Sequence, residues 1–109
     1  TMKNLFTYAG VILQRTASPA IAGRSVETSS WQDQGFEVSR AATTYRFDNG
    51  VVIRRTVERD TFPCAAVCAE CWISYEVLSD GSLDNPVGPR RKTFENACRE
   101  SFWLSYHMA

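Results

Sequence analysis

Four cysteines are the side chains whose type and spacing could carry chemistry in this chain of 109 residues. Three of them form the cluster Cys64-x3-Cys68-x2-Cys71, and the fourth is Cys98. If Pro63 opens a short helix, the clustered thiols lie at i, i+4 and i+7 on one helical face, where cysteine packs as a small apolar side chain. We therefore expect buried, reduced thiols, with a disulfide or a metal site as the alternatives.

A metal site would use the three clustered thiolates, with Cys98 or His107 as the fourth ligand. Structural zinc sites usually have two separated Cys-x2-Cys or Cys/His pairs, whereas this chain has one cluster. The same spacing holds the iron–sulfur cluster of radical enzymes that cleave S-adenosylmethionine, but 109 residues cannot build the large barrel that such an enzyme needs. We expect no metal and no cofactor.

Catalysis by a histidine has little to build on, because His107 is the only histidine and lies two residues from the end. A cysteine or serine nucleophile needs a base that a third group orients, and no residue is placed to orient this imidazole. The chain also lacks a Gly-x-Ser-x-Gly elbow and a glycine-rich phosphate loop. The sequence favours a protein that is not an enzyme.

The elements that would position any site begin with a predicted β-hairpin over residues 43–57, with Asp-Asn-Gly at 48–50 between two runs of β-formers. A three-residue loop with Gly50 in the left-handed region pairs Tyr45 with Ile53, whereas a two-residue turn would mix apolar and charged side chains on both faces. We predict the three-residue loop, because it separates an inward set (Tyr45, Phe47, Val51, Ile53, Val57) from an outward set (Thr44, Arg46, Arg54, Thr56, Glu58), with inward Arg55 and outward Val52 as exceptions.

Other strands are predicted over Leu5–Leu13, from Gly35 onward and over Trp72–Leu78, where apolar and polar side chains alternate in the last case. A short helix over Leu5–Leu13 is the alternative, since periodicity cannot separate the two in so short an apolar run. The stretch Thr16–Ser30, rich in small and hydroxyl residues, predicts a long connection.

Near the end of the chain, residues 83–92 read as a loop and Thr93 as the N-cap of a helix that runs to Leu104 or beyond. The elements together predict an α+β fold, with a small antiparallel sheet of three to five strands, including the 43–57 hairpin. The C-terminal helix packs on one face of this sheet. We expect a single domain over residues 1–109.

Composition and charge narrow the function classes. The 12 basic and 12 acidic residues cancel, so no overall field attracts nucleic acid or an anionic membrane. Residues 2–22 imitate a secretory signal, but Thr7 and Gly10 interrupt the apolar run Leu5–Leu13, so we treat this segment as folded structure. We expect a cytoplasmic, soluble protein that does not enter a membrane.

One surface has the composition of an interface. Trp72 alternates with Ile73 and so points to the outer side of the sheet, where we expect it near Val52. Arg46 and Arg54 are diagonal neighbours on the same side. Tryptophan and arginine are enriched where proteins meet, so the leading hypothesis is a non-enzymatic interaction domain that binds a partner protein or self-associates as a homo-oligomer through its sheet face. Its interface candidates are Val52, Trp72, Arg46 and Arg54.

Two alternatives are kept. One is a small-molecule or catalytic pocket between sheet and helix, lined by Tyr45, Tyr75, Cys98 and Trp103. The other is nucleic-acid binding through the arginine-bearing face, which charge and base stacking would drive. The latter is disfavoured, because the hairpin aromatics point inward and three glutamates, Glu37, Glu58 and Glu76, can pair with the arginines.

Overall fold

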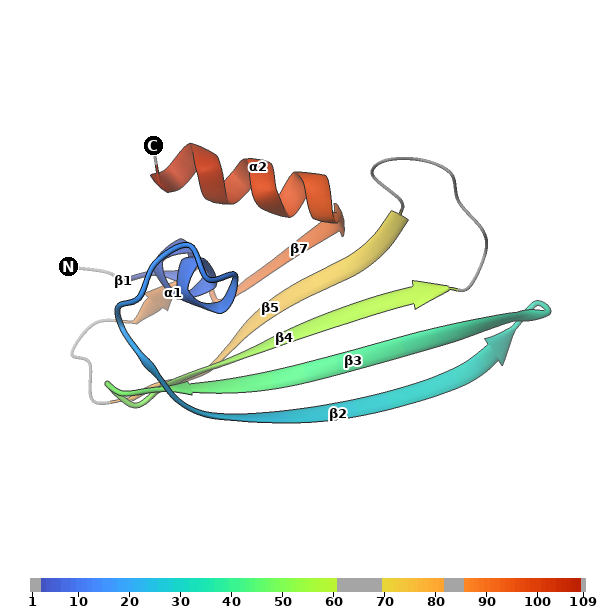
Figure 1. Ribbon diagram of the computed structural model, residues 1–109, viewed down its shortest axis with the longest axis horizontal. Helices are drawn as coiled ribbons and strands as arrows, with labels where there is room; N and C mark the ends of the chain where they lie inside the picture. The colour runs from blue at the N-terminus through green and yellow to red at the C-terminus, as the bar shows by residue number, and fades with distance from the viewer. Residues whose placement is uncertain (1–2, 61–69, 82–85, 109) are drawn as a thin grey trace.

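The described part of the chain folds into an antiparallel sheet with two helices on one side of it, as the computed structural model in Figure 1 shows. The structure describes residues 3–60, 70–81 and 86–108. In chain order the elements are β1 (Lys3–Asn4), α1 (Leu5–Ile12), β2 (Ile21–Asp33), β3 (Phe36–Phe47), β4 (Val51–Asp60), β5 (Glu70–Asp80), β6 (Val87–Gly88), β7 (Arg91–Asn96) and α2 (Ala97–Met108). The predicted α+β class, with a C-terminal helix on one face of an antiparallel sheet, is confirmed.

The sheet has five strands in the order β2-β3-β4-β5-β7, and every neighbouring pair is antiparallel. The short strands β1 and β6 form a separate parallel ladder, which pairs Lys3 with Val87 and Asn4 with Gly88. We call the face of the five-stranded sheet that contacts α1 and α2 the inner face, and the opposite face the outer face.

The predicted hairpin register is confirmed. Tyr45 lies opposite Ile53, and the Gly50 N–H donates a hydrogen bond of 3.0 Å to the Phe47 carbonyl. Gly50 has φ 86°, the left-handed conformation that the three-residue loop requires. This register turns Phe47, Ile53 and Val51 into the core, so the alternation of the sequence and the turn chemistry agree.

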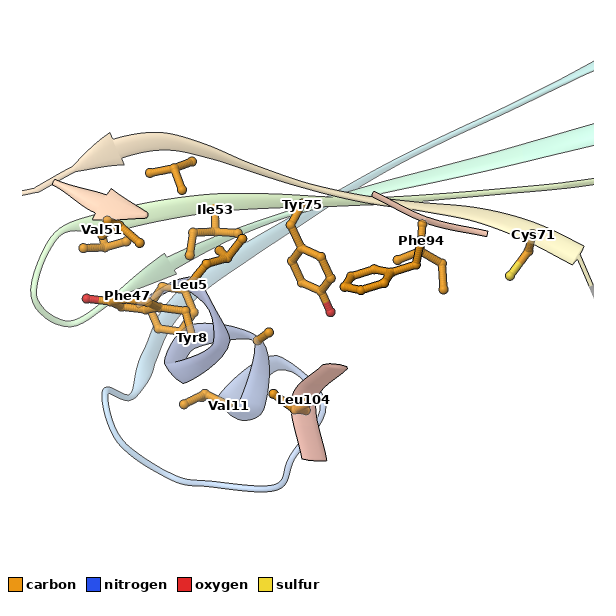
Figure 2. Close-up of a cluster of buried hydrophobic side chains, with 14 residues drawn as sticks. Leu5, Tyr8, Val11, Phe47, Val51, Ile53, Cys71, Tyr75, Phe94 and Leu104 are labelled. Atoms are coloured by element: carbon orange, nitrogen blue, oxygen red, sulfur yellow. The ribbon is translucent and has the colours of Figure 1, made fainter. Parts of the chain in front are cut away.

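The core lies between the inner face and the two helices (Figure 2). The rings of Tyr8 and Phe47 meet edge to face with centroids 4.9 Å apart, which joins α1 to the β3–β4 hairpin. Arg15, just after α1, donates hydrogen bonds to the hydroxyls of Ser101 and Ser105 on α2, at 2.7 and 2.9 Å. The two helices therefore form one layer against the sheet.

The prediction of a strand over Leu5–Leu13 is wrong, because Leu5–Ile12 forms the helix α1. Its buried residues Leu5, Tyr8 and Ala9 recur at helical spacing, and they cover part of the inner face. Intrinsic propensity is a weak preference that tertiary packing overrides. Burial against the sheet thus decides between the two structures that the short apolar run allowed.

The long connection predicted over Thr16–Ser30 is also wrong, since residues 21–33 form β2. Nearly every side chain of β2 is exposed, so neither face shows the apolar alternation by which a strand is recognised. Pairing with β3 holds the segment extended. This pairing is continuous from Gly23, opposite Arg46, to Asp33, opposite Phe36.

The prediction that the C-terminal helix begins at Thr93 is wrong, because a strand precedes the helix there. Residues 91–96 form β7, in which Thr93 lies opposite Ser74 of β5, and α2 begins at Ala97. The residue that caps the helix is Asn96, whose Oδ1 accepts a hydrogen bond of 2.8 Å from the Arg99 N–H.

Strands β2 and β3 continue well past the helices (Figure 1). We call their far part, residues 24–33 and 36–43, the arm. It closes in a tight turn at Gln34 and Gly35, with φ of 52° and 83°, and it gives the molecule a longest dimension of 47 Å. No helix of the described chain lies over the arm, so its residues are exposed or half-buried on both faces.

Candidate functional site

The outer face is the candidate site, because both helices lie on the other side of the sheet. Strand alternation sends Arg54, Thr56 and Glu58 of β4 to this face, while Ile53 and Val57 turn inward. The register of the neighbouring strands then brings side chains that are far apart in sequence into cross-strand rows. One row runs Ser29, Arg40, Glu58 and Trp72, and another runs Ser25, Thr44, Arg54, Glu76 and Arg91.

Between these two rows lies a shallow groove of about 220 Å³. Trp72 forms one part of its lining and remains 47% exposed. The other lining residues are three arginines, two glutamates and two hydroxyl side chains: Arg40, Arg54, Arg91, Glu58, Glu76, Thr56 and Ser74. A neighbouring hollow of about 250 Å³ shares Arg40 and Arg54 and extends toward Glu27 on β2. Arg40 and Arg54 are therefore common to both depressions of this face.

The charges of the groove are partly compensated. Glu76 accepts a hydrogen bond of 2.6 Å from Arg54 and lies 3.8 Å from the guanidinium of Arg91, so one carboxylate serves two arginines. The expected neutralisation of the arginine face by glutamates is thus confirmed for Glu76. Within the described part of the chain, Arg40 and Arg46 lie within 4 Å of no carboxylate. These two guanidinium groups retain their capacity to bind an incoming acid.

Arg46 of β3 lies at the far end of the outer face. Its cross-strand neighbours are Val52 on β4 and Gly23 on β2. The guanidinium covers Gly23 so closely that a Cβ there would lie 2.8 Å from its Nη2. The expected diagonal placement of Arg46 and Arg54 is confirmed by the register.

The expectation that Trp72 lies near Val52 is wrong. Trp72 is opposite Glu58, six residues along β4 from Val52, which corresponds to about 20 Å in an extended strand. The Arg54–Glu76 ion pair lies between them. The four interface candidates therefore share one face but do not form one apolar patch. Arg54 and Trp72 lie together in the groove, while Arg46 and Val52 lie beyond it.

A second polar cluster lies on the inner face, where Arg55 turns inward as predicted. Its guanidinium donates two hydrogen bonds to the carboxylate of Glu100 on α2, each at 2.9 Å. The hydroxyl of Tyr75 donates a third to the same carboxylate at 2.5 Å. Glu100 is only 3% exposed, and no sequence argument had selected it. The signal that could have found it is the inward arginine itself, which needs a buried acid, together with helical spacing from Leu104.

Electrostatics explain why this cluster links α2 to the sheet. Burial raises the pKa of the Tyr75 phenol, and the adjacent Glu100 carboxylate raises it further, so the hydroxyl keeps its proton. Burial alone would lower the pKa of the Arg55 guanidinium, but its hydrogen bonds and charge interactions with Glu100 and Tyr75 together outweigh burial, so the pKa is raised. Tyr75 and Glu100 are buried and hydrogen-bonded to each other, so of this cluster only part of the Arg55 side chain reaches solvent.

Among the described residues, the pocket candidates do not line a common pocket. The rings of Tyr75 and Trp103 lie 6.3 Å apart, but Phe94 packs against both, so this part of the interface is filled. Tyr45 is half-buried against the core. Cys98 is exposed near the start of α2 and is disulfide-bonded.

The cysteines have two different fates. Cys71 is a free thiol buried at the start of β5, which confirms a packed, reduced thiol at that position. For Cys98 the same prediction is wrong, because its sulfur is in a disulfide. The predicted packing of Cys64 and Cys68, and the helix expected after Pro63, lie outside the described residues. Over residues 3–60, 70–81 and 86–108, no three His, Cys, Asp or Glu side chains are grouped as a metal site would need.

Neither of the helices in the described chain is both long and apolar enough to cross a membrane. Comparison with known protein families, with curated proteins and with solved structures found no match to this chain. The physical chemistry of the outer face is therefore the basis for a functional hypothesis.

Proposed function

We propose that this chain is a non-enzymatic interaction domain that binds a partner protein through the outer face of its sheet. The observation that carries the proposal is Trp72, nearly half exposed in a groove with three arginines, on a face that neither helix covers. A few central residues supply most of the binding energy at protein interfaces, and tryptophan and arginine are enriched among them. A sheet supplies the rigid platform that such a contact needs.

The charge of the groove favours a protein over a nucleic acid. Its lining has three arginines and two glutamates, so its net charge is only +1. Glu58 and Glu76 would repel phosphates at close range, and the chain as a whole is neutral. A partner segment with an acidic residue for Arg40 and an apolar residue for Trp72 fits these side chains better.

Selection of binding peptides from a random library, with the purified chain as bait, tests the proposal. We expect the selected peptides to combine acidic and apolar residues. Trp72→Ala should weaken their binding about 30-fold, the loss of about 2 kcal/mol typical of a central interface residue. Phe102→Ala, which removes an exposed aromatic ring on α2, is the matched control and should leave binding unchanged.

Peptides that bind Trp72→Ala as tightly as the original chain would overturn the proposal. A labelled single-stranded oligonucleotide provides the second arm. If it binds at 0.15 M salt and loses binding with Trp72→Ala, the outer face is a nucleic-acid surface and the proposal is wrong.

A further inference from the structure

Within the described residues, the two helices cover only part of the inner face of the sheet. The helices pack on core residues of β3, β4, β5 and β7, while the arm extends past them (Figure 1). On the inner side of the arm lies an open hollow of about 730 Å³. Its lining consists of six small side chains and two arginines: Thr28, Ser29, Ser30, Ser39, Ala41, Val57, Arg40 and Arg59.

The row at the centre of the hollow carries no charge, while the next inward row ends in Arg59. On the inner side, Thr28, Ala41 and Val57 form one cross-strand row, and Val57 continues into the buried core residue Ile73. On the outer side, the adjacent rows carry charged residues such as Glu27 and Arg40. A sheet face that lacks charge along such a row is the kind that another element covers.

Two exposed aromatic side chains form an apolar ridge on α2. Phe102 and Tyr106 are 68% and 72% exposed, and no other large hydrophobic side chain of the described residues is as exposed. They are four residues apart, so they lie on one side of the helix. That side is turned away from the protein's own sheet, because Glu100 and Leu104 occupy the side that packs against it.

We propose that the hollow is covered by the ridge of a second copy of this chain, in a reciprocal dimer. Two copies with their inner faces toward each other, related by a twofold axis, place each α2 between its own sheet and the partner's arm. Phe102 and Tyr106 of each copy then pack on the small residues of the other copy's hollow. The dimer would have three layers, with a sheet on each outside and helices from both copies between them.

The area that the ridges and hollows can bury comes close to that of a specific interface. An aromatic side chain buries about 200 Å², so the exposed parts of Phe102 and Tyr106 offer about 280 Å² per copy. Two such ridges and the two hollow surfaces that they cover amount to about 1,100 Å², close to the lower limit of about 1,200 Å² for a specific interface. Neighbouring side chains on α2 and the arm would add to this. The arrangement leaves the outer groove at Trp72 open, so it is independent of the proposed function.

Sedimentation velocity on the full chain from about 1 to 200 μM tests the dimer. We expect a species of twice the 12.3 kDa chain mass, with a dissociation constant in this range. Phe102→Ser should raise this constant at least tenfold, and since the ring is exposed, the monomer should keep its fold by circular dichroism. Ala41→Arg should act similarly by filling the hollow. Trp72→Ala, an exposed aromatic on the opposite face, is the matched control and should leave the dimer intact.

A mixing experiment separates this reciprocal interface from other dimers. In a mixture of Phe102→Ser and Ala41→Arg chains, the intact ridge of the second can enter the intact hollow of the first. We therefore expect the mixture to associate at concentrations where each variant alone is monomeric. A chain that stays monomeric throughout, a dimer unaffected by Phe102→Ser, or a dimer lost with Trp72→Ala would each overturn the proposal.

Discussion

Replacing Glu100 with leucine tests whether the buried ion pair with Arg55 holds α2 on the sheet. The variant removes the acceptor of three hydrogen bonds, two from Arg55 at 2.9 Å and one from Tyr75 at 2.5 Å. Removing one partner of a buried pair costs about 3–5 kcal/mol, because the remaining charge is left without compensation. The Arg55 side chain is 21% exposed, so water can solvate its charge and offset part of the lost stability. We expect a decrease of about 3 kcal/mol in the free energy of unfolding.

The assay is a double-mutant cycle, in which the free energy of unfolding of each variant is measured by urea denaturation with circular dichroism as the signal. Arg55→Met alone leaves the Glu100 carboxylate buried and should cost at least as much as Glu100→Leu, because Glu100 is almost fully enclosed. The double variant Arg55→Met/Glu100→Leu replaces the pair with apolar side chains and should lose less stability than either single variant. Tyr75→Phe, which removes only one hydroxyl, should cost about 1 kcal/mol.

Additive losses in this cycle would refute the reasoning. Such a result would mean that Arg55 and Glu100 contribute through their packing with other neighbours, and that the hydrogen bonds between them add nothing to stability. An effect of Glu100→Leu below about 0.5 kcal/mol, the usual range for surface substitutions, would contradict the burial of the carboxylate as well.

Three further predictions concern stability. Gly50→Val should cost about 1–3 kcal/mol in urea denaturation, because a β-branched residue is strained at φ 86°, and an unchanged midpoint would contradict that turn conformation. Ile53→Ala should cost about 2–5 kcal/mol as a core truncation, while Arg46→Ala on the outer face should stay within about 0.5 kcal/mol; the reverse order would mean that the faces are exchanged. The Val87 N–H donates a hydrogen bond to the Asp80 carboxylate and so lowers the pKa of Asp80 below its usual 3.8. The stability that the ionised Asp80 contributes is therefore present above pH 3.8 and is lost as the pH falls below 3.8. Asp80→Asn should therefore have a shallower loss of stability below pH 3.8 than the original chain, and parallel curves would exclude this contribution.

The part of the fold that the sequence predicted is the part that local chemistry determines. In the β3–β4 hairpin, the turn residues and the alternation of Phe47, Val51 and Ile53 specify the same register, and both are visible within 15 residues. β2 has no such internal signal, since its side chains are exposed and its strand structure depends on pairing with β3. α1 depends in the same way on a sheet formed by later parts of the chain.

The candidate site followed the same division. The outward direction of Trp72 follows from alternation within β5 alone, and it was predicted. Its neighbours depend on how β5 pairs with β4, where the extra residue Leu78 of β5 shifts the register, and this pairing cannot be predicted from either strand alone. For this reason Glu58 and Arg40, rather than Val52, lie in its row. The role of Glu100 could not be predicted from nearby residues, because its partner Arg55 is 45 residues away in the chain.

The turn at Gln34 and Gly35 offers a practical attachment point. An added Cβ at Gly35 would meet no atom within 4 Å, whereas at Gly81 it would lie 2.4 Å from the backbone of Gly50. The first turn stands free at the tip of the arm, while the second is packed against another turn. A short epitope or a cysteine for a fluorescent label should therefore be accepted between Gln34 and Gly35 without loss of the fold. Placed there, a fluorophore would lie beside the hollow on one face and beyond the Trp72 groove on the other, so a single labelled protein could report on occupation of either surface.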